Sequence, residues 1–174
     1  MIGVEIDFVV SDSIKALETY EKIFDIQRVE VSNYERGLNE VIFTMYGTRF
    51  HMLDENPEYQ LVGPHPGNPQ PMWINVLVPD IERTYETAIS LGGTEIQGVT
   101  KMDALGISNA LFSCPFGYVW MLHQVHRVVT PKERHAMLES MLKQTRRERR
   151  RLRRENAKKA RPGYEEYFAE DDEE

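Results

Sequence analysis

Residues 4–31, VEIDFVVSDSIKALETYEKIFDIQRVEV, decide the fold, because residues 72–99, MWINVLVPDIERTYETAISLGGTEIQGV, follow the same plan. Each stretch begins with an alternating apolar run, continues through an aspartate that can cap a helix into an amphipathic segment, and ends in a second strand-like run. Matching Asp12 to Asp80 superposes the apolar positions of the two helices and of the two first strands. A repeat of this length predicts two similar modules related by a pseudo-twofold rotation.

Further strand-like runs, separated by turn residues, complete each half. They lie at about residues 27–33, 39–46 and 48–54 in the first half and at about 94–100, 105–113 and 118–125 in the second. This order predicts an α+β fold of two βαβββ modules that form a curved mixed-sheet cleft, followed by a C-terminal helical extension. The predicted boundaries are 1–54 for the first module, 55–71 for a proline-rich linker, 72–127 for the second module, 128–161 for a C-terminal helix with a basic run, and 162–174 for an acidic tail.

The alternation of side chains along the strands separates two faces. One face is apolar throughout and should pack under the helices; it carries Ile6, Phe8, Val10, Phe50, Met52, Ile74, Val76, Val78, Trp120 and Leu122. The other face carries Glu5, Asp7, Val9, Arg49, His51, Leu53, Trp73, Asn75, Leu77, Val119, Met121 and His123. Such a mixture of polar and apolar side chains is typical of a ligand cavity.

The two strand and helix runs, together with the turn and strand SCPFGYVWMLHQ at residues 113–124, resemble the vicinal oxygen chelate superfamily. This superfamily includes glyoxalase I, extradiol dioxygenases, fosfomycin-resistance enzymes and bleomycin-binding proteins. The resemblance covers about residues 3–125, and the aromatic content of the last strand suggests the PhnB-like branch. It implies a paired-module fold and a homodimer, because members are commonly dimeric.

In metal-dependent members, the resemblance implies four ligand positions on the first and last strand of each module. In this sequence those positions are Glu5, His51, Trp73 (or Ile74, with one residue of alignment slack) and Met121. Indole is not a ligand, and a methionine thioether suits softer metals than the ions that carboxylate and imidazole bind. The first module therefore keeps two plausible ligands and the second keeps none.

Two interpretations of the remaining polar residues stay open. His123 lies two residues beyond Met121 on the same face and could lean back to complete a Glu5, His51 and His123 metal set. Alternatively, both histidines are partly buried and form hydrogen bonds across the sheet to Asp7 or Glu5, and Arg49 holds the carboxylate of Glu5.

Three functions are compatible with these residues. The first is a small-molecule-binding protein without the full family metal site and without a cofactor, in which Trp73 stacks on a planar ligand and Asp7, Arg49, Asn75, Met121 and His123 complete the cleft. The second is a metal-dependent lyase, isomerase or dioxygenase of the glyoxalase type, with a divalent ion held by Glu5, His51 and His123. The third is an interaction protein that acts through its basic helix. No residue is singled out as a catalytic group.

Charge is strongly segregated along the chain. Residues 1–142 hold 10 Lys+Arg against 19 Asp+Glu, residues 143–161 hold 11 against 2, and residues 162–174 hold none against 7. Thr130, Pro131 and Glu133 form a capped helix start, and an apolar stripe from Ala136 to Leu142 should dock on the body or on a second subunit. The run between Arg146 and Arg154 is either a solvated helix, a segment paired with the acidic tail, a bridge between subunits or a contact for a polyanion.

The single cysteine, Cys114, excludes an intramolecular disulfide and a cysteine-based zinc site, and we expect it to be a small residue in a turn. No run of about 18 apolar residues is present, and the sequence starts without the features of a signal peptide. We therefore expect a cytoplasmic protein without a membrane contact.

Overall fold

The computed structural model describes residues 4–64 and 72–159 of the chain. The chain divides into two compact units, Met1–Arg127 and Val128–Glu174. The predicted linker at 55–71 therefore lies partly outside the described residues, and the predicted acidic tail at 162–174 lies wholly outside them.

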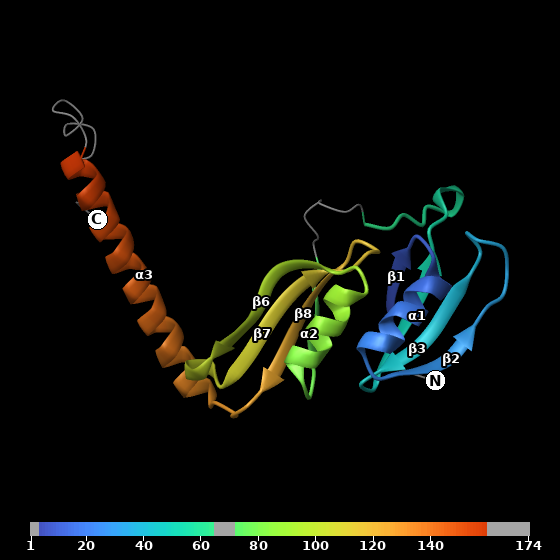
Figure 1. Ribbon diagram of the computed structural model, residues 1–174, viewed down its shortest axis with the longest axis horizontal. Coiled ribbons are helices and arrows are strands. Elements are labelled where there is room, and N and C mark those ends of the chain that lie inside the picture. The colour runs from blue at the N-terminus through green and yellow to red at the C-terminus, as the bar shows by residue number, and fades with distance from the viewer. Residues whose placement is uncertain (1–3, 65–71, 160–174) are drawn as a thin grey trace. The chain divides into compact units, whose positions relative to one another are not determined.

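Two βαβββ modules form the first unit, which confirms the predicted fold class (Figure 1). The first module comprises β1 (Ile6–Val10), α1 (Ser13–Ile23), β2 (Ile26–Val31), β3 (Glu40–Met45) and β4 (Thr48–Asp54), followed by the short helix η1 (Pro57–Tyr59). The second comprises β5 (Ile74–Leu77), α2 (Ile81–Ser90), β6 (Thr94–Met102), the short helix η2 (Asp103–Leu105), β7 (Ile107–Ser113) and β8 (Val119–Val125).

The two sheets have the same topology, and the strand pairs that include the last strand of each module also have the same register. Their strand orders are β1-β4-β3-β2 and β5-β8-β7-β6. The first and last strand of each module pair in parallel, and in these pairs Asp7 lies opposite His51 and Asn75 lies opposite Met121. Because these are equivalent positions in the sequence repeat, β5–β8 repeats the pairing of β1–β4 residue by residue, whereas β6–β7 has two register shifts where β2–β3 has one.

Each module helix begins at the aspartate that the sequence predicts. The side chain of Asp12 accepts a hydrogen bond from the backbone N–H of Lys15, and the side chain of Asp80 accepts one from that of Arg83. These bonds satisfy backbone donors in the first helical turn, which have no partner within the helix.

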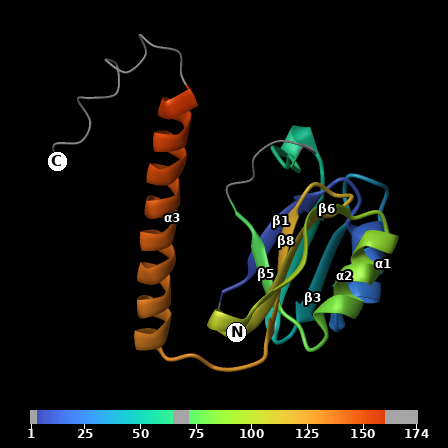
Figure 2. The same cartoon turned by 60° about the vertical axis from the view of Figure 1, so that its left-hand side comes forward.

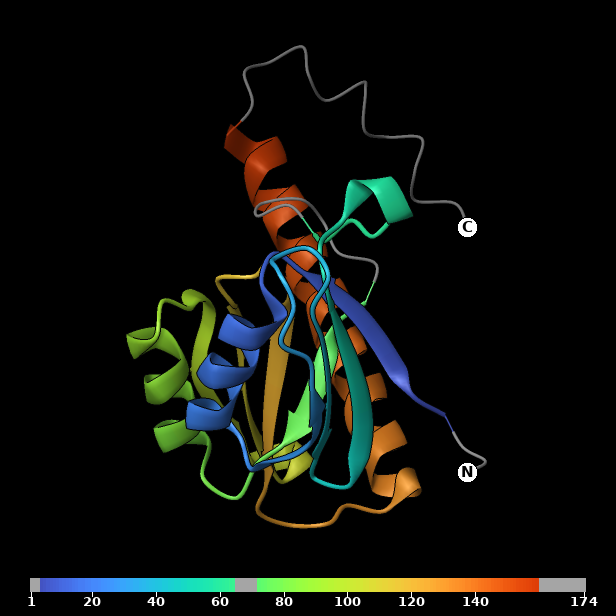
Figure 3. The same ribbon diagram turned by 90° about the vertical axis from the view of Figure 1, so that its right-hand side faces the viewer.

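The core lies between the helices and one face of each sheet. The residues of the predicted apolar face are all buried, with Ile74 the most exposed of them at 8%, apart from the half-buried Ile6. Figures 2 and 3 show α1 and α2 side by side on the same side of the sheets. The indole ring of Trp120 on β8 lies 5.1 Å from the ring of Tyr20 and 5.0 Å from that of Phe24. The first module therefore packs its aromatic side chains directly on a strand of the second.

Two polar contacts also join the modules. The hydroxyl of Tyr118 donates a hydrogen bond of 3.0 Å to the carbonyl oxygen of Val9 and accepts one of 3.2 Å from its N–H, at the free edge of β1. The thiol of Cys114 is buried and its sulfur lies 3.3 Å from the hydroxyl oxygen of Tyr20. This confirms that Cys114 is a packed residue of the turn region.

The second unit contains α3 (Pro131–Lys159). The predicted helix start is confirmed, because Thr130 N–H donates to Glu133 Oε2 over 2.7 Å and Glu133 N–H donates to Thr130 Oγ1 over 3.2 Å. The predicted end of this helix, at residues 162–163, lies outside the described residues. Within the part of the chain that the structure describes, no helix combines the length and the apolar content that crossing a membrane requires.

Candidate functional site

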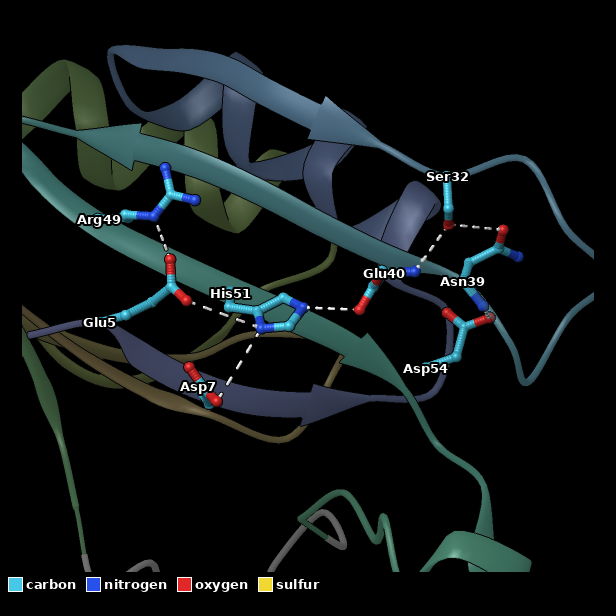
Figure 4. Close-up of polar contacts among 8 residues, drawn as sticks. All are labelled: Glu5, Asp7, Ser32, Asn39, Glu40, Arg49, His51 and Asp54. Atoms are coloured by element: carbon cyan, nitrogen blue, oxygen red, sulfur yellow. Dashed lines mark hydrogen bonds and ion pairs between the residues drawn. The ribbon is translucent and has the colours of Figure 1, made fainter. Parts of the chain in front are cut away.

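The face of the first sheet that points away from α1 carries a group of charged side chains around His51 (Figure 4). Asp7 on β1 lies opposite His51 on β4, and Glu40 on β3 lies opposite Leu53, two residues further along β4. Because side chains alternate along a strand, Asp7, Arg49, His51 and Glu40 all project from this face. Glu5, which directly precedes β1, projects from the same side.

Three carboxylates surround the imidazole of His51, whose side chain is 18% exposed. Its Nε2 lies 3.0 Å from Glu40 Oε2, whereas its Nδ1 lies 3.9 Å from Glu5 Oε1 and 4.0 Å from Asp7 Oδ2. A neutral imidazole that donates to Glu40 through Nε2 has its lone pair on Nδ1, directed at the other two carboxylates. The arrangement therefore presents one nitrogen and two carboxylate oxygens toward a common point.

Arg49 forms an ion pair with Glu5 through its Nε atom. This confirms the sequence-based interpretation in which Arg49 holds the carboxylate of Glu5. The guanidinium places a positive charge beside the three carboxylates, so the group as a whole stays acidic but part of its charge is neutralised.

Glu40 is a residue of this site that the sequence did not single out. It begins β3, and its backbone N–H donates a hydrogen bond of 2.8 Å to Ser32 Oγ. Ser32 Oγ in turn lies 3.1 Å from Oδ1 of the buried Asn39, which also accepts a hydrogen bond from Tyr34 N–H. This network fixes the start of β3 and with it the carboxylate that contacts His51. Extending the alternation of faces to β3, where Glu40 precedes Ile42 and Thr44 on one face, would have found it.

The loop that precedes Glu40 is held in place by hydrogen bonds to a buried carboxylate. Asp54 is 2% exposed, and it accepts hydrogen bonds from the backbone N–H groups of Ser13 at 2.7 Å, Gly37 at 2.8 Å and Asn39 at 3.2 Å. Burial alone would raise the pKa of Asp54, but the hydrogen bonds from Ser13, Gly37 and Asn39 outweigh it, so the pKa lies below its usual value. Asp54 thus joins the start of α1 to the segment that leads into the site.

The equivalent face of the second sheet is mostly apolar and carries amides instead of charges. Trp73 directly precedes β5 and is 52% exposed. Asn75 lies opposite Met121, and His123 lies opposite Leu77. Burial lowers the pKa of His123, so its imidazole is neutral at neutral pH. The two modules therefore present faces of unlike chemistry at equivalent positions.

The structure brings together only part of the predicted metal set. Among the described residues, the donor atoms of Glu5, Asp7 and His51 lie within 4.8 Å of one another, and His123 is not in this group. Two carboxylates and an imidazole suit a divalent ion such as Mn²⁺ or Zn²⁺, and ligands about 2.1 Å from one ion lie at most about 4.2 Å apart. The separations of 3.9 and 4.0 Å from His51 Nδ1 are close to this limit, which two ligands reach only on opposite sides of an ion, so the three side chains would have to move closer together to hold one ion. The hydrogen bond that His51 Nε2 donates to Glu40 is the kind of contact that orients a metal-binding histidine.

Paired βαβββ modules with polar side chains on the open sheet faces define the class of protein. A sequence model of the Glyoxalase/Bleomycin resistance protein/Dioxygenase superfamily matches residues 4–122. The chain belongs to this superfamily. No curated protein matches the chain in sequence.

Solved structures agree with this fold. The fosfomycin resistance protein FosX from Listeria monocytogenes has 16% sequence identity and a TM-score of 0.55, and the match covers 77% of this chain and 99% of that one. TioX from Micromonospora sp. ML1 has 13% identity and a TM-score of 0.54, over 73% of this chain and 100% of that one. FosX from Mesorhizobium loti has 19% identity and a TM-score of 0.53, over 77% and 98%. A mutant of the Listeria protein has been solved with Mn(II) and 1S,2S-dihydroxypropylphosphonic acid.

Proposed function

We propose that this protein binds a small molecule that combines a planar or apolar body with a polar group. The observation that supports this proposal is the pair Trp73 and Met121. They occupy the positions in the second module where metal-dependent members of the superfamily carry ligands, and neither suits a hard divalent ion.

The second-module face offers the contacts that a planar body needs. An indole that is 52% exposed provides a large surface for stacking, and offset aromatic contacts contribute about 0.5 to 1.5 kcal/mol beyond the burial of area. Met121 is flexible and polarisable and can adapt to the outline of a ligand. Asn75 and the neutral His123 supply hydrogen bonds that orient it.

The first-module face supplies the charged contacts. Asp7 has a side chain that is 63% exposed, and Arg49 and His51 are within reach of the same point. A ligand group that donates hydrogen bonds, or that carries a positive charge, is favoured there, because carboxylates outnumber the guanidinium.

The two tryptophans of the chain make this proposal directly measurable. Trp120 is 1% exposed, so a ligand that quenches or shifts tryptophan emission on binding reports on Trp73. A thermal-shift screen of small aromatic and oxygenated metabolites identifies ligands, because binding at about 100 times Kd stabilises the folded state by about 2.7 kcal/mol. The affinities of the wild type and of the Trp73→Ala and Trp73→Phe variants are then compared by isothermal titration calorimetry, because the variants lack the fluorescent reporter.

We expect Trp73→Ala to weaken binding about tenfold or more and Trp73→Phe to retain most of the affinity, because phenyl also stacks. A ligand that stabilises the protein but binds the Trp73→Ala variant with unchanged affinity would refute the proposed role of this face.

A second candidate function, a metal-dependent lyase, isomerase or dioxygenase, is supported by the donor group of Glu5, Asp7 and His51. When bound, a divalent ion would supply Lewis-acid catalysis. The three side chains would hold it and Glu40 would orient His51. Arg49 opposes this function, because a guanidinium beside the donors repels a cation and competes for Glu5.

The competition between Arg49 and a cation yields a direct test. We expect the Arg49→Gln variant to bind Mn²⁺ about tenfold more tightly than the wild type, equivalent to about 1.4 kcal/mol, and His51→Ala to lose binding. Arg83→Gln, which removes a similar charge from the first turn of α2, is the matched control. Isothermal titration of protein prepared with a chelator measures all four. If neither the wild type nor Arg49→Gln binds the ion, the metal-dependent function is wrong.

Three finer predictions also stay proposals: membership of the PhnB-like branch, a homodimer and a cytoplasmic location. The exposed Trp73, Leu77 and Val125 on the second sheet support the homodimer, since apolar side chains grouped on one face favour association. Light scattering during size exclusion measures the mass of the assembly.

A further inference from the structure

The middle of α3 carries the highest density of positive charge in the described chain. Of the 12 residues from 143 to 154, eight are Lys or Arg, one is an acid and one, Leu152, is a large apolar residue. Every residue of this segment is exposed. A segment with this composition cannot pack into an apolar core, because burying unpaired guanidinium groups is strongly unfavourable.

The arginines lie on one side of the helix. At about 100° per residue, positions i, i+3, i+4, i+7 and i+8 share a face. These positions are occupied by Arg146, Arg149, Arg150, Arg153 and Arg154, which we call the arginine stripe. Arg147 and Arg151 widen the basic arc to about 200° of the helix circumference, and Lys143 lies within it. The opposite side carries Glu148, Leu152 and Glu155.

The stripe arginines are not neutralised within the helix. Arg151, at the edge of the arc, pairs with Glu155 at 3.4 Å, and Lys143, which precedes the stripe along the helix, pairs with Glu139 at 3.7 Å. Within the part of the chain that is described, no ion pair involves any of the five stripe arginines. The segment therefore presents a row of free guanidinium groups, which bind phosphate oxygens in a bidentate manner.

The composition and shape of this surface indicate which anionic partner it fits. A helix that lies on a lipid surface needs an apolar face, and Leu152 alone does not provide one. Binding of single strands depends on aromatic stacking, and residues 143–159 contain no aromatic side chain. The major groove of A-form RNA is too deep and narrow to admit side chains. The major groove of B-form DNA is about 12 Å wide and admits an α-helix between two walls of phosphates.

We propose that residues 143–154 of α3 bind duplex DNA, with the helix in the major groove and the stripe arginines on the phosphates. A basic arc of about 200° fits this geometry, because the helix meets phosphates on both of its flanks. The segment spans about 16 Å of helix axis, over which duplex DNA carries about nine phosphate charges. Contacts to the phosphate backbone carry no base preference, so binding is independent of sequence.

This proposal goes beyond the small-molecule function and narrows the polyanion contact to one class of partner. Its failure leaves the small-molecule function untouched, because residues 143–154 lie in the second compact unit, outside the superfamily match at 4–122.

The test measures binding of the full-length chain to a fluorescein-labelled 20-base-pair DNA duplex by anisotropy at several salt concentrations. With six phosphate contacts, from Lys143 and the five stripe arginines, we expect a slope of log K against log salt of about −5. The variant Arg146→Gln/Arg149→Gln/Arg150→Gln/Arg153→Gln keeps helix propensity but removes four contacts. We expect its slope to become shallower by about 3.6 and its affinity at about 0.15 M salt to fall on the order of a thousandfold. Circular dichroism confirms that the variant remains helical.

The same four positions changed to Lys form the matched control, because they keep the charge. We expect the salt slope of this variant to equal that of the wild type and its affinity to stay within about tenfold. The proposal is overturned if the wild type does not bind the duplex at about 0.05 M salt, or if the glutamine variant binds as tightly as the wild type. It is also overturned if double-stranded RNA, single-stranded DNA or anionic vesicles are bound more tightly than duplex DNA.

Discussion

Replacing the buried carboxylate of Asp54 should destabilise the protein in a way that depends on pH. All three of its partners are backbone N–H donors, shared between Oδ1 and Oδ2. In Asp54→Asn one carboxylate oxygen becomes an NH₂ group. This group cannot accept a hydrogen bond, and it faces at least one of the three backbone N–H groups that Asp54 binds. Hydrogen bonds to a charged group contribute about 1.5 to 3 kcal/mol each, and a buried donor left unpaired costs about 1 to 3 kcal/mol. Some of this loss is relieved by local adjustment, so we expect the free energy of unfolding to fall by about 2 to 4 kcal/mol at neutral pH.

The pH dependence follows from the direction of the pKa shift. The pKa of Asp54 is lower in the folded protein than in the unfolded chain, where it is about 3.9. Its contribution to stability is therefore complete above about pH 5 and is lost as the pH falls through the folded-state pKa. We expect the difference between the wild type and Asp54→Asn to be largest at neutral pH and to shrink below about pH 4.

Gln124, the equivalent residue of the second module, provides a control with the opposite behaviour. Its Oε1 accepts a hydrogen bond of 3.2 Å from Ile81 N–H, and its Nε2 donates one of 2.7 Å to the carbonyl oxygen of Pro79. In Gln124→Glu the carboxylate has no N–H to donate, and its negative charge faces the carbonyl oxygen of Pro79. When the carboxyl group is protonated, its O–H can donate a hydrogen bond to that oxygen again. We therefore expect Gln124→Glu to recover stability on acidification.

Urea denaturation of the three proteins at pH 7 and at about pH 3.5, followed by the emission of the buried Trp120, measures both effects. A loss below about 0.5 kcal/mol in Asp54→Asn at pH 7, or a loss that is equal at both pH values, would contradict the role assigned to the carboxylate.

Other predictions concern the site and the module contact. Glu40→Gln should weaken any Mn²⁺ binding about tenfold or more while leaving the thermal midpoint nearly unchanged, because a neutral amide accepts a weaker hydrogen bond from the imidazole of His51 than a carboxylate does; unchanged titration curves would exclude an orienting role. Tyr118→Phe should lower the free energy of unfolding by about 1 to 2 kcal/mol, because both hydrogen bonds to Val9 are lost, and chemical denaturation tests this. Cys114 should react with a thiol reagent such as DTNB only on unfolding; prompt labelling of the native protein would show that the turn opens.

The fold could be predicted from the sequence because its signals are local and occur twice. The caps at Asp12 and Asp80 and the alternation along the strands each depend on neighbouring residues only. The resulting expectation for β3, residues 39–46, differs from the observed Glu40–Met45 by a single residue at each end. Duplication then fixed the equivalence of the two sheets, which the pairings of His51 and Met121 confirm.

The part of the site that was predicted depends only on which face of a strand each side chain occupies. Arg49 and Glu5 project from adjacent strands of one face, so alternation was enough to place them together. Alternation along β3 also puts Glu40 on this face, but its contact with His51 depends on the β3–β4 register, which the turn at Tyr46 and Gly47, both with positive φ, sets. His123 belongs to the other sheet, opposite Asn109 on β7. Spacing along a strand gives its distance from Met121 but contains no information on how one sheet lies against the other.

The repeated register has a consequence for engineering. Asn75, Asn109 and Met121 occupy in the second sheet the places that Asp7, Glu40 and His51 occupy in the first. The triple substitution Asn75→Asp, Asn109→Glu and Met121→His would therefore place on the second sheet the three side chains that Asp7, Glu40 and His51 provide on the first, at positions with the same backbone pairing. Because the two modules have equivalent backbones, the side chains on the open face of one module can be exchanged without changing those of the other. The same backbone can therefore present several combinations of polar and apolar faces.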